Sequence, residues 1–502
     1  MIDIVCIGHD FHYEIKELLK LFFPHGEMSI STYDEMPEDL FNETQAEHEI
    51  IISRLTIQGS HILVEAYSNQ SSEVQHVSIE VTIQENSSSR ETSKKCKLLL
   101  KKSLFQFLRN MKHVNIPWGI LLGIRPTKIV HELLNAGLSD QYIIEHLLEE
   151  YFVQEEKAQL LLDVAKKEYQ YIYPIDEGLV SLYISVPFCP TRCLYCSFPS
   201  NSVTQWGHLM DEYVEQLCVE ITEIGKLLKQ KNKKIETLYI GGGTPTTLHI
   251  SHFDKIFQSV YASFDKDRIK EITVEAGRPD TIDLEKLAFL KSQGTTRVSI
   301  NPQTMNDCTL QTIGRKHSVQ DFLEACKMAR DAGFENINMD LIIGLPGEDS
   351  EMVAYTMKEI QKLAPTNLTV HTLAIKKGSN LIKDQEHYEL SQHDEIQKML
   401  QITRNYAEKL GLHPYYMYRQ KHMLGNFENI GYSAIGYECI YNIQIMEEKQ
   451  TIIAVGAGGV SKFTYPKENR LERVPNVKDL EHYIQRVDEM VQRKQKFISI
   501  MS

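Results

Sequence analysis

The stretch YISVPFCPTRCLYCSFPS, residues 183–200, places three cysteines within eight residues, directly after an apolar run typical of a strand. These are Cys189, Cys193 and Cys196. A structural zinc site usually takes four ligands in paired clusters, and no second pair follows at the expected distance. Three thiolates instead suit an iron–sulfur cluster that keeps one iron open for a substrate or cosubstrate. The stretch therefore predicts a strand that ends in a metal-binding loop.

The same rhythm of strand, loop and helix continues through residues 175–378. Strands are expected in SLYISVP (181–187), IETLYIGGG (235–243), EITVEAG (271–277), TRVSINPQ (296–303), INMDLIIGLPG (337–347) and LTVHTLAI (368–375). Helices are expected near 209–230, 252–263, 283–293, 319–332 and 350–363. Six βα units in succession predict parallel strands with right-handed crossovers, in an open doubly wound sheet or a complete or partial barrel. In each case chemistry belongs at the carboxyl ends of the strands.

The flanking segments predict three further regions. Residues 1–110 form an expected N-terminal α+β domain, with a strand (2–8), a helix (12–23) and alternating stretches (49–57, 61–68 and 74–84) that suit an antiparallel sheet. The polar run QENSSSRETSKK (84–95) indicates an exposed loop. Residues 111–174 are expected to be a helical connector. Residues 379–502 are expected to be a smaller C-terminal α+β domain that completes the substrate cavity, with a helix (394–411), strands (413–423, 438–448 and 451–459) and a helix near 477–493.

Composition limits the class of protein. The chain has 502 residues and a formal net charge of -14, which argues against a generic nucleic-acid binder. Six of the nine cysteines are scattered singly and would be reduced thiols in a cytoplasm. No apolar stretch of about 18 residues could span a bilayer, and the start lacks the pattern of a signal peptide. We therefore expect a cytoplasmic protein.

The spacing CxxxCxxC, after a strand ending in VPF and before six βα units, resembles that of the radical S-adenosylmethionine enzymes. The resemblance implies a partial (β/α)6 barrel and one 4Fe-4S cluster held by Cys189, Cys193 and Cys196. It also implies that the amino and carboxylate groups of S-adenosyl-L-methionine chelate the open iron.

Later strand ends resemble one branch of that superfamily. The sequence YIGGGTPT (239–246) is typical of the oxygen-independent coproporphyrinogen III oxidase-like branch. Segments 116–128, 413–426 and 438–462 extend the resemblance to the HemZ-type coproporphyrinogen dehydrogenases. The resemblance implies that the cosubstrate is bound by Tyr183, Gly242, Gly243, Thr244, Glu275, Gln303, Arg315 and Asp340, with Glu275 on the ribose hydroxyls. Tyr183 and Arg315 are the residues expected to be catalytic.

The implied reaction is an oxidative decarboxylation in haem biosynthesis. A 5′-deoxyadenosyl radical takes a hydrogen atom from the β-carbon of a propionate, and loss of carbon dioxide and one electron leaves a vinyl group. Two rounds convert coproporphyrinogen III to protoporphyrinogen IX. The implied partners are the tetrapyrrole substrate and an electron donor such as a flavodoxin or ferredoxin.

Two positions depart from the YxHxPFCxxxCxYCxC pattern of the oxidases. Ser185 replaces the histidine, and Phe198 replaces the last cysteine. The phenylalanine form also occurs in the related haem-chaperone branch. A haem-binding chaperone without decarboxylase activity and a radical tetrapyrrole methyltransferase therefore stay as alternatives.

A substrate with four carboxylates needs cations near the mouth of the barrel. The candidates in this acidic chain are Arg125, Lys128, Arg192, Lys376, Lys377, Arg419 and Lys421. For any single one of them, a solvated surface charge is the alternative.

Overall fold

The computed structural model describes residues 2–24, 26–37, 49–68, 76–84, 88–123, 125–198, 200–376, 378–383, 388, 391–420, 423 and 427–501. The chain forms two compact units. Unit 1 holds residues 1–126 and 132–162, and unit 2 holds residues 127–131 and 163–502. Each unit has a sheet of its own. The expected division into four domains stays a prediction.

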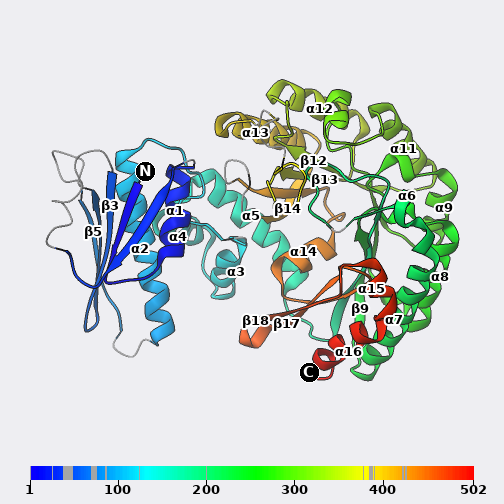
Figure 1. The fold of residues 1–502 in the computed structure, drawn as a ribbon, viewed down its shortest axis with the longest axis horizontal. Coiled ribbons are helices and arrows are strands. Elements are labelled where there is room, and N and C mark those ends of the chain that lie inside the picture. The colour runs from blue at the N-terminus through cyan, green and yellow to red at the C-terminus, as the bar shows by residue number, and fades with distance from the viewer. Residues whose placement is uncertain are drawn as a thin grey trace. The chain divides into compact units, whose positions relative to one another are not determined.

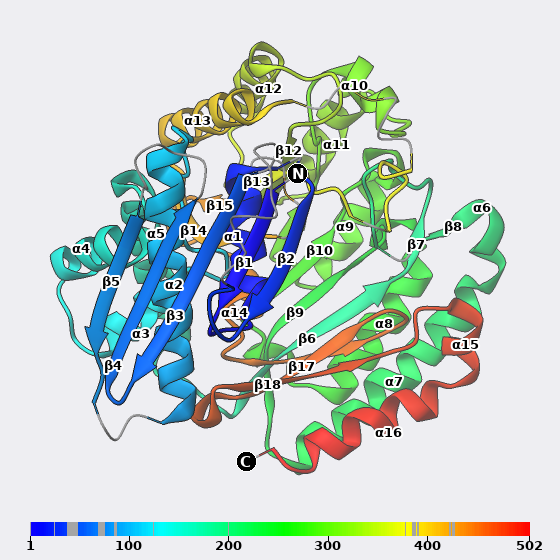
Figure 2. The ribbon, with the colours of Figure 1, turned by 60° about the vertical axis from the view of Figure 1, so that its left-hand side comes forward.

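Unit 1 is built on a five-stranded sheet in the order β2-β1-β3-β4-β5 (Figure 2). Its strands are β1 (Ile2–Ile7), β2 (Met28–Tyr33), β3 (Glu49–Gln58), β4 (His61–Ser68) and β5 (His76–Thr82). Strands β3, β4 and β5 are antiparallel, as expected, but β1 pairs in parallel with β2 and β3. The physical reason is the crossover helix α1 (His12–Phe22) between β1 and β2, since parallel neighbours need a long connection. Apolar side chains of α1 and of α2 (Ser89–Met111) pack with the sheet into one core.

The polar run 84–95 is not a loop throughout, because α2 already begins at Ser89. The Ser88 side chain accepts a hydrogen bond from the Glu91 backbone N–H at 3.3 Å. The Glu91 carboxylate accepts one from the Ser88 N–H at 2.9 Å. This reciprocal capping starts a helix in a segment whose composition alone favours a loop. The helices that follow are α3 (Thr127–Asn135), α4 (Asp140–Tyr151) and α5 (Glu155–Ile172).

Unit 2 is built on an 11-stranded sheet in the order β14-β15-β13-β12-β11-β10-β9-β6-β16-β17-β18. The six expected strands are β6 (Leu179–Val186), β9 (Lys234–Gly242), β10 (Glu271–Glu275), β11 (Arg297–Ser299), β12 (Asn336–Ile343) and β13 (Asn367–Thr372). Each pairs in parallel with the next, which confirms the expected α/β architecture. All six carboxyl ends therefore lie at one edge of the sheet.

The crossover helices cover the outside of this curved sheet (Figure 1). They are α7 (Met210–Gln230), α8 (Ile250–Ser263), α9 (Leu284–Ser292), α11 (Val319–Asp331) and α12 (Ser350–Leu363), with the short α6 (Val203–Trp206) and α10 (Asp307–Thr312) in the connecting loops. Each of the five longer helices has buried apolar residues on one side, such as Leu217, Ile221, Ile224 and Leu228 on α7. The opposite, concave face of the sheet carries polar and aromatic side chains, among them Tyr183, Tyr239 and Asp340.

The C-terminal segment extends both edges of the same sheet. Its strands are β14 (His413–Tyr418), β15 (Asn429–Ser433), β16 (Thr451–Val455), β17 (Val460–Tyr465) and β18 (Arg470–Pro475), and its first helix is α13 (His393–Lys409). Strand β15 is antiparallel to β13, whereas β16 is parallel to β6 at the other side. The predicted terminal helix is two helices, α15 (Leu480–Gln485) and α16 (Val487–Ile498).

The expected strand over 438–448 is wrong, because this segment holds helix α14 (Ile440–Glu447). The Glu271 carboxylate accepts hydrogen bonds from the backbone N–H groups of Ile440 at 2.9 Å and Tyr441 at 3.1 Å. Those groups have no partner within a helix, so a carboxylate from the start of β10 caps it. This long-range cap has no signal in the local sequence.

In the part of the chain that the structure describes, no helix is both long enough and apolar enough to cross a membrane.

Candidate functional site

The three clustered cysteines lie on the loop that follows β6, at the carboxyl edge of the unit 2 sheet. Cys189 belongs to the short strand β7 (Phe188–Cys189), which pairs with β8 (Asn201–Ser202). The loop is held against the end of β9, because the Thr244 N–H donates to the Phe188 carbonyl at 2.7 Å. The predicted metal-binding loop and the glycine loop are thereby brought together.

The thiols lie in a mostly buried environment with two nearby hydrogen-bond donors. Cys189 and Cys193 are each 9% exposed. The Thr244 hydroxyl donates to Cys189 Sγ at 3.6 Å, and Arg278 Nη1 donates to Cys193 Sγ at 3.8 Å. Burial, with a smaller contribution from the nearby charges of Cys196 and Cys193, raises the pKa of the Cys189 thiol to about 11, although the Thr244 hydrogen bond acts to lower it. The three sulfurs are thus close enough to repel one another as thiolates, and a bound cation would relieve that repulsion.

Glycine is required in the loop after β9 because the cysteine loop approaches its backbone closely. A Cβ atom on Gly243 would lie 2.6 Å from the Phe188 carbonyl oxygen and 2.8 Å from Cys189 Sγ. Gly242 has φ +117°, a conformation that residues with a side chain rarely adopt. The glycines therefore let the backbone of β9 reach the cysteine loop.

Glu275, at the end of β10, faces this loop. Its carboxylate accepts hydrogen bonds from the Tyr239 hydroxyl at 2.7 Å and from the Gly242 N–H at 3.3 Å. Burial, with a smaller contribution from the charge of Asp340, raises the pKa of Glu275 to about 7, although the hydrogen bonds from Tyr239 and Gly242 act to lower it. The carboxyl group is thus poised to be either protonated or ionised near neutral pH, as functional carboxyl groups often are.

Three tyrosines stack beside Glu275 on the concave face. Tyr183 and Tyr239 are directly paired on β6 and β9, with ring centroids 6.0 Å apart. Tyr441 of α14 stacks on both rings, at 6.0 Å from Tyr183 and 4.4 Å from Tyr239. Tyr183 was predicted as a site residue, whereas Tyr239 and Tyr441 were not. The period of two along β9 could have indicated Tyr239, but Tyr441 is placed by α14.

Gln303 and Arg315 carry buried polar atoms without a hydrogen-bond partner among the described residues. These atoms are Gln303 Oε1 and Arg315 Nε. The Gln303 backbone is in the left-handed region, with φ +66°, and is fixed by its pairing with β12. The Arg315 guanidinium donates to the carbonyls of Gly277 at 3.0 Å and Asn301 at 2.9 Å. Since buried polar groups are normally satisfied, the two orphaned atoms indicate a place for a polar ligand.

Asp340 lies on β12 within a small polar group of the concave face. Asn338 Nδ2 donates to Asp340 Oδ1 at 2.8 Å, and His371 Nε2 lies 3.9 Å from Asp340 Oδ2. Burial acts to raise the pKa of Asp340, but the His371 ring and the Asn338 amide outweigh it and hold the pKa below its usual value. The Tyr418 hydroxyl oxygen and His371 Nδ1 are 3.2 Å apart, within hydrogen-bond distance. His371 and Tyr418 were not predicted as site residues.

Arg278 is a further residue that sequence reasoning missed. It is 4% exposed and follows β10 in the turn GRPD. Asp280 fixes the guanidinium with contacts of 3.0 and 3.1 Å, and Arg278 Nη1 also donates to the Thr191 hydroxyl at 3.1 Å. A cation therefore binds the cysteine loop from outside the cysteine motif. The only local signal is an arginine followed by Pro-Asp at a strand end.

The candidate cations for substrate carboxylates are placed in different surroundings. Arg192 and Lys376 lie close enough to Cys196 to lower the pKa of its thiol, against the larger effect of burial. Arg419 is 3% exposed, and burial lowers its pKa to about 10. Arg125 belongs to unit 1. Lys377 and Lys421 lie outside the described residues.

Lys128 does not lie at the predicted mouth. It donates to the Asn469 side chain at 3.2 Å. Asn469 follows β17, whose Thr464 N–H donates to Thr451 Oγ1 at the amino-terminal end of β16. Because β16 runs parallel to β6, Lys128 is at the edge opposite the cysteine loop.

The two positions that depart from the oxidase pattern differ in burial. Ser185 is buried and donates to the Ala457 carbonyl at 2.8 Å. Phe198 is 62% exposed, and the Lys376 ammonium lies 6.0 Å from its ring centroid. Ser185 thus fixes the strand ends, whereas Phe198 leaves an apolar ring in solvent near the cysteines.

Comparison with known proteins finds similarity over the region that holds the cysteine loop. A model of the Radical SAM superfamily matches residues 183–360. The oxygen-independent coproporphyrinogen-III oxidase-like protein HemZ of Bacillus subtilis (strain 168) is 41% identical over 76% of this chain and 77% of its own length. Heme chaperone HemW of the same organism is 29% identical over 62% of this chain and 76% of its own length.

Among solved structures, coproporphyrinogen III oxidase (HemN) from Escherichia coli, a radical SAM enzyme, matches with a TM-score of 0.52. The match covers 66% of this chain and 78% of that one at 23% identity, and it supports the fold alone.

Proposed function

Because the chain belongs to the HemZ-type branch of the radical S-adenosylmethionine superfamily, we propose that it decarboxylates two propionates of coproporphyrinogen III to vinyl groups, giving protoporphyrinogen IX. Members of this superfamily use a 4Fe-4S cluster and S-adenosylmethionine. The observation that carries the proposal is the three-cysteine loop, mostly buried at the carboxyl ends of the parallel strands, in a chain 41% identical to HemZ over 76% of its length.

The residues at this loop fit the cluster. Cys189, Cys193 and Cys196 supply three thiolates and leave a fourth position for a cosubstrate. Thr244 and Arg278 offer hydrogen bonds to two of the sulfurs, at 3.6 and 3.8 Å. Such donors stabilise the negative charge that thiolate ligands carry. When bound, the cluster and S-adenosylmethionine supply a carbon-centred radical that can take a hydrogen atom from carbon.

The neighbouring residues fit the polar cosubstrate. The backbone of Gly242 and Gly243 leaves room that a side chain would fill. We assign Glu275 to the ribose hydroxyls, since a carboxylate accepts two such hydrogen bonds. Gln303 Oε1 and Arg315 Nε, both buried without a described partner, are the acceptor and donor left for other polar groups.

The tyrosine stack and Asp340 have proposed roles in orientation. Tyr183, Tyr239 and Tyr441 form a rigid wall on the concave face, where they exclude water from the reacting carbon. Asp340 is held ionised by its neighbours and can accept a hydrogen bond from a ligand hydroxyl or ring nitrogen. In each round the propionate β-carbon would lose a hydrogen atom to the 5′-deoxyadenosyl radical, carbon dioxide would be released, and an external one-electron acceptor would take the remaining electron to leave the vinyl group.

The substrate carboxylates need cations close to the cysteine loop. Arg192 and Lys376 are both near Cys196 and are our candidates for propionate contacts, together with the buried Arg419. An external one-electron donor such as a flavodoxin or ferredoxin is required. The binding of such a donor to this protein stays a proposal.

Product analysis tests the reaction. The reconstituted full chain is incubated anaerobically with coproporphyrinogen III, dithionite and S-adenosylmethionine, and porphyrins are separated after oxidation. We expect protoporphyrin IX and 5′-deoxyadenosine from the wild type and neither from Cys193→Ala. Cys326→Ala is the matched control, since Cys326 is buried in α11 away from the loop. A loaded cluster with no vinyl product would refute the decarboxylase.

A haem chaperone is the second candidate. It is favoured by Phe198 at the position of the last oxidase cysteine and by the 29% identity to HemW. In that case the same preparation would bind haem stoichiometrically and form no vinyl product. Methylated tetrapyrrole with S-adenosylhomocysteine would indicate the methyltransferase instead.

A further inference from the structure

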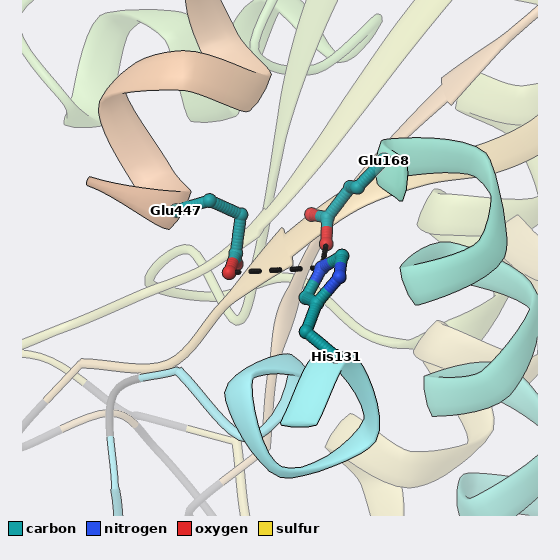
Figure 3. A group of neighbouring side chains, drawn as sticks. All are labelled: His131, Glu168 and Glu447. Carbon is teal, nitrogen blue, oxygen red and sulfur yellow. Dashed lines mark hydrogen bonds and ion pairs between the residues drawn. The ribbon is translucent and has the colours of Figure 1, made fainter. Parts of the chain in front are cut away.

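Three buried side chains of unit 2 converge at a place that the proposed reaction does not use (Figure 3). They are His131 of α3, Glu168 of α5 and Glu447 of α14. His131 is 2% exposed, Glu168 is 0% exposed and Glu447 is 1% exposed. One ligand atom from each lies within 4.8 Å of the other two.

The distances between donor atoms are those of a site for a single ion. His131 Nε2 lies 2.9 Å from Glu168 Oε2 and 3.7 Å from Glu447 Oε2. A tetrahedral zinc ion with bonds of about 2.1 Å separates its ligand atoms by about 3.4 Å, which lies between these two values. Small side-chain shifts would therefore bring all three onto one ion.

Hydrogen bonding leaves this group incompletely satisfied. Glu168 Oε1 and His131 Nδ1 are buried and have no hydrogen-bond partner among the described residues. A histidine ring that reaches both carboxylates through Nε2 can give its one N–H there to only one of them. Thr127 donates to Glu447 Oε1 at 2.7 Å, and Glu447 Oε2 lies 3.7 Å from His131 Nε2.

A metal ion would also balance charge in this group. Two carboxylates in a buried space repel each other, and this repulsion together with burial is costly unless a proton or a cation compensates it. The Lys449 ammonium acts on the His131 ring from nearby, and a metal ion bound by all three side chains would place a further positive charge between the carboxylates. The His131 ring is packed against the rings of Tyr169 and Tyr173, at 6.3 and 5.9 Å. A histidine nitrogen among the donors favours zinc or a similar transition metal over magnesium or calcium.

We infer that His131, Glu168 and Glu447 form a binding site for one divalent transition-metal ion of the zinc type, separate from the cysteine loop. The ion would join three residues that are far apart in the chain: 37 positions separate His131 from Glu168, and 279 positions separate Glu168 from Glu447. It would fix the C-terminal end of α14, whose other end is held by Glu271. Tyr441, in the first turn of α14, belongs to the tyrosine stack. The ion would thus stabilise the position of α14 and, through it, of Tyr441 in the tyrosine stack.

The experiment must first remove the cysteine ligands, because thiolates bind zinc strongly. The full chain with Cys189→Ser, Cys193→Ser and Cys196→Ser is purified with a chelator, and Zn²⁺ or Co²⁺ alone is titrated into it. We expect one ion per chain, an increase in Tm on binding, and cobalt spectra with d–d bands but no sulfur charge-transfer band. Wild-type protein loaded with its cluster should contain zinc besides iron.

Substitutions in that triple-serine chain locate the ion. Glu168→Gln and, separately, His131→Gln should each weaken binding at least tenfold and abolish the Tm increase. His252→Gln is the matched control, since His252 also pairs with a carboxylate, Asp211 Oδ1 at 2.7 Å, and should bind as the parent does.

The inference is overturned if the triple-serine chain binds no ion below millimolar concentration, or if both variants bind as tightly as their parent. Circular dichroism checks that each variant is folded. Should Glu168→Gln fail to fold, His131→Gln and Glu447→Gln decide the question by the same titration. None of these readouts depends on tetrapyrrole chemistry, so failure of the proposed function leaves the inference testable.

Discussion

Replacing Gly243 with alanine tests whether the glycine loop and the cysteine loop act as one unit. The added methyl group would lie 2.6 Å from the Phe188 carbonyl oxygen and 2.8 Å from Cys189 Sγ. Ordinary contacts between heavy atoms are about 3.5 Å, so each neighbour must move by more than half an ångström. The Phe188 oxygen is main chain, and it is held by the Thr244 N–H at 2.7 Å. The strain therefore falls on the position of Cys189.

The magnitude follows from the cost of overpacking. One extra methyl group in a well-packed region costs about 1–3 kcal/mol. If binding of the cluster requires Cys189 in its present place, that cost is subtracted from the binding free energy. At about 1.4 kcal/mol per factor of ten, the affinity for the cluster falls about 5- to 140-fold.

The assay is anaerobic reconstitution with limiting iron and sulfide, followed by competition with an iron chelator. Iron and sulfide per chain and the visible absorbance of the cluster are measured for Gly243→Ala and for the wild type. Gly123→Ala is the control, because a Cβ atom there meets nothing within 4 Å. Retention of the cluster by Gly243→Ala at the chelator concentration that the wild type withstands would refute the reasoning.

Three further outcomes are expected. Thr244→Val removes the donor 3.6 Å from Cys189 Sγ, so the reduction potential of the cluster should fall in an EPR-monitored redox titration; an unchanged potential would contradict this. In the apoprotein, the pKa of Glu275 is raised from 4.5 to about 7, so the folded state binds this proton more tightly than the unfolded chain does. The contribution of this proton to stability is therefore full below pH 4.5 and is lost as the pH rises to 7. The free energy of unfolding in urea should accordingly fall by up to about 3 kcal/mol more for the wild type than for Glu275→Gln across that range. If the free energies of the two proteins change in parallel with pH, the reasoning is wrong. Lys494→Met should lower the free energy of unfolding by about 3–5 kcal/mol, because it strips the buried carboxylate of Glu220 of its ammonium partner. The two groups lie 2.7 Å apart and are both 0% exposed, and Glu220→Gln combined with Lys494→Met should recover most of the loss.

The alternating pattern of the central region was sufficient to predict its strands and helices. Each strand there is a short apolar run that ends in glycine or polar residues, and each helix carries one apolar stripe. The pattern failed where a tertiary contact decides the element. Residues 438–448 contain isoleucine and tyrosine in alternation with polar residues, as a strand would, yet they form α14 because the Glu271 carboxylate caps its first turn.

The candidate site divides in the same way. The cysteines, the glycine loop and Glu275 could be identified because each follows a strand directly, and parallel strands bring such positions to one edge. Arg278 and Tyr441 could not, because their neighbours in space are remote in the chain. Arg278 meets Cys193, and Tyr441 meets Tyr239, only once the loops and α14 are in place.

The amino-acid sequence by itself determined the spacing of the three candidate cysteine ligands and the alternation of strands and helices, since both are patterns of residues that are near one another in the chain. The tertiary structure alone decided which side chains surround those sulfurs, and it alone brought His131, Glu168 and Glu447 within reach of one another. Periodicity records which face of an element is buried. It does not record which distant element covers that face, because this depends on the path of the whole chain.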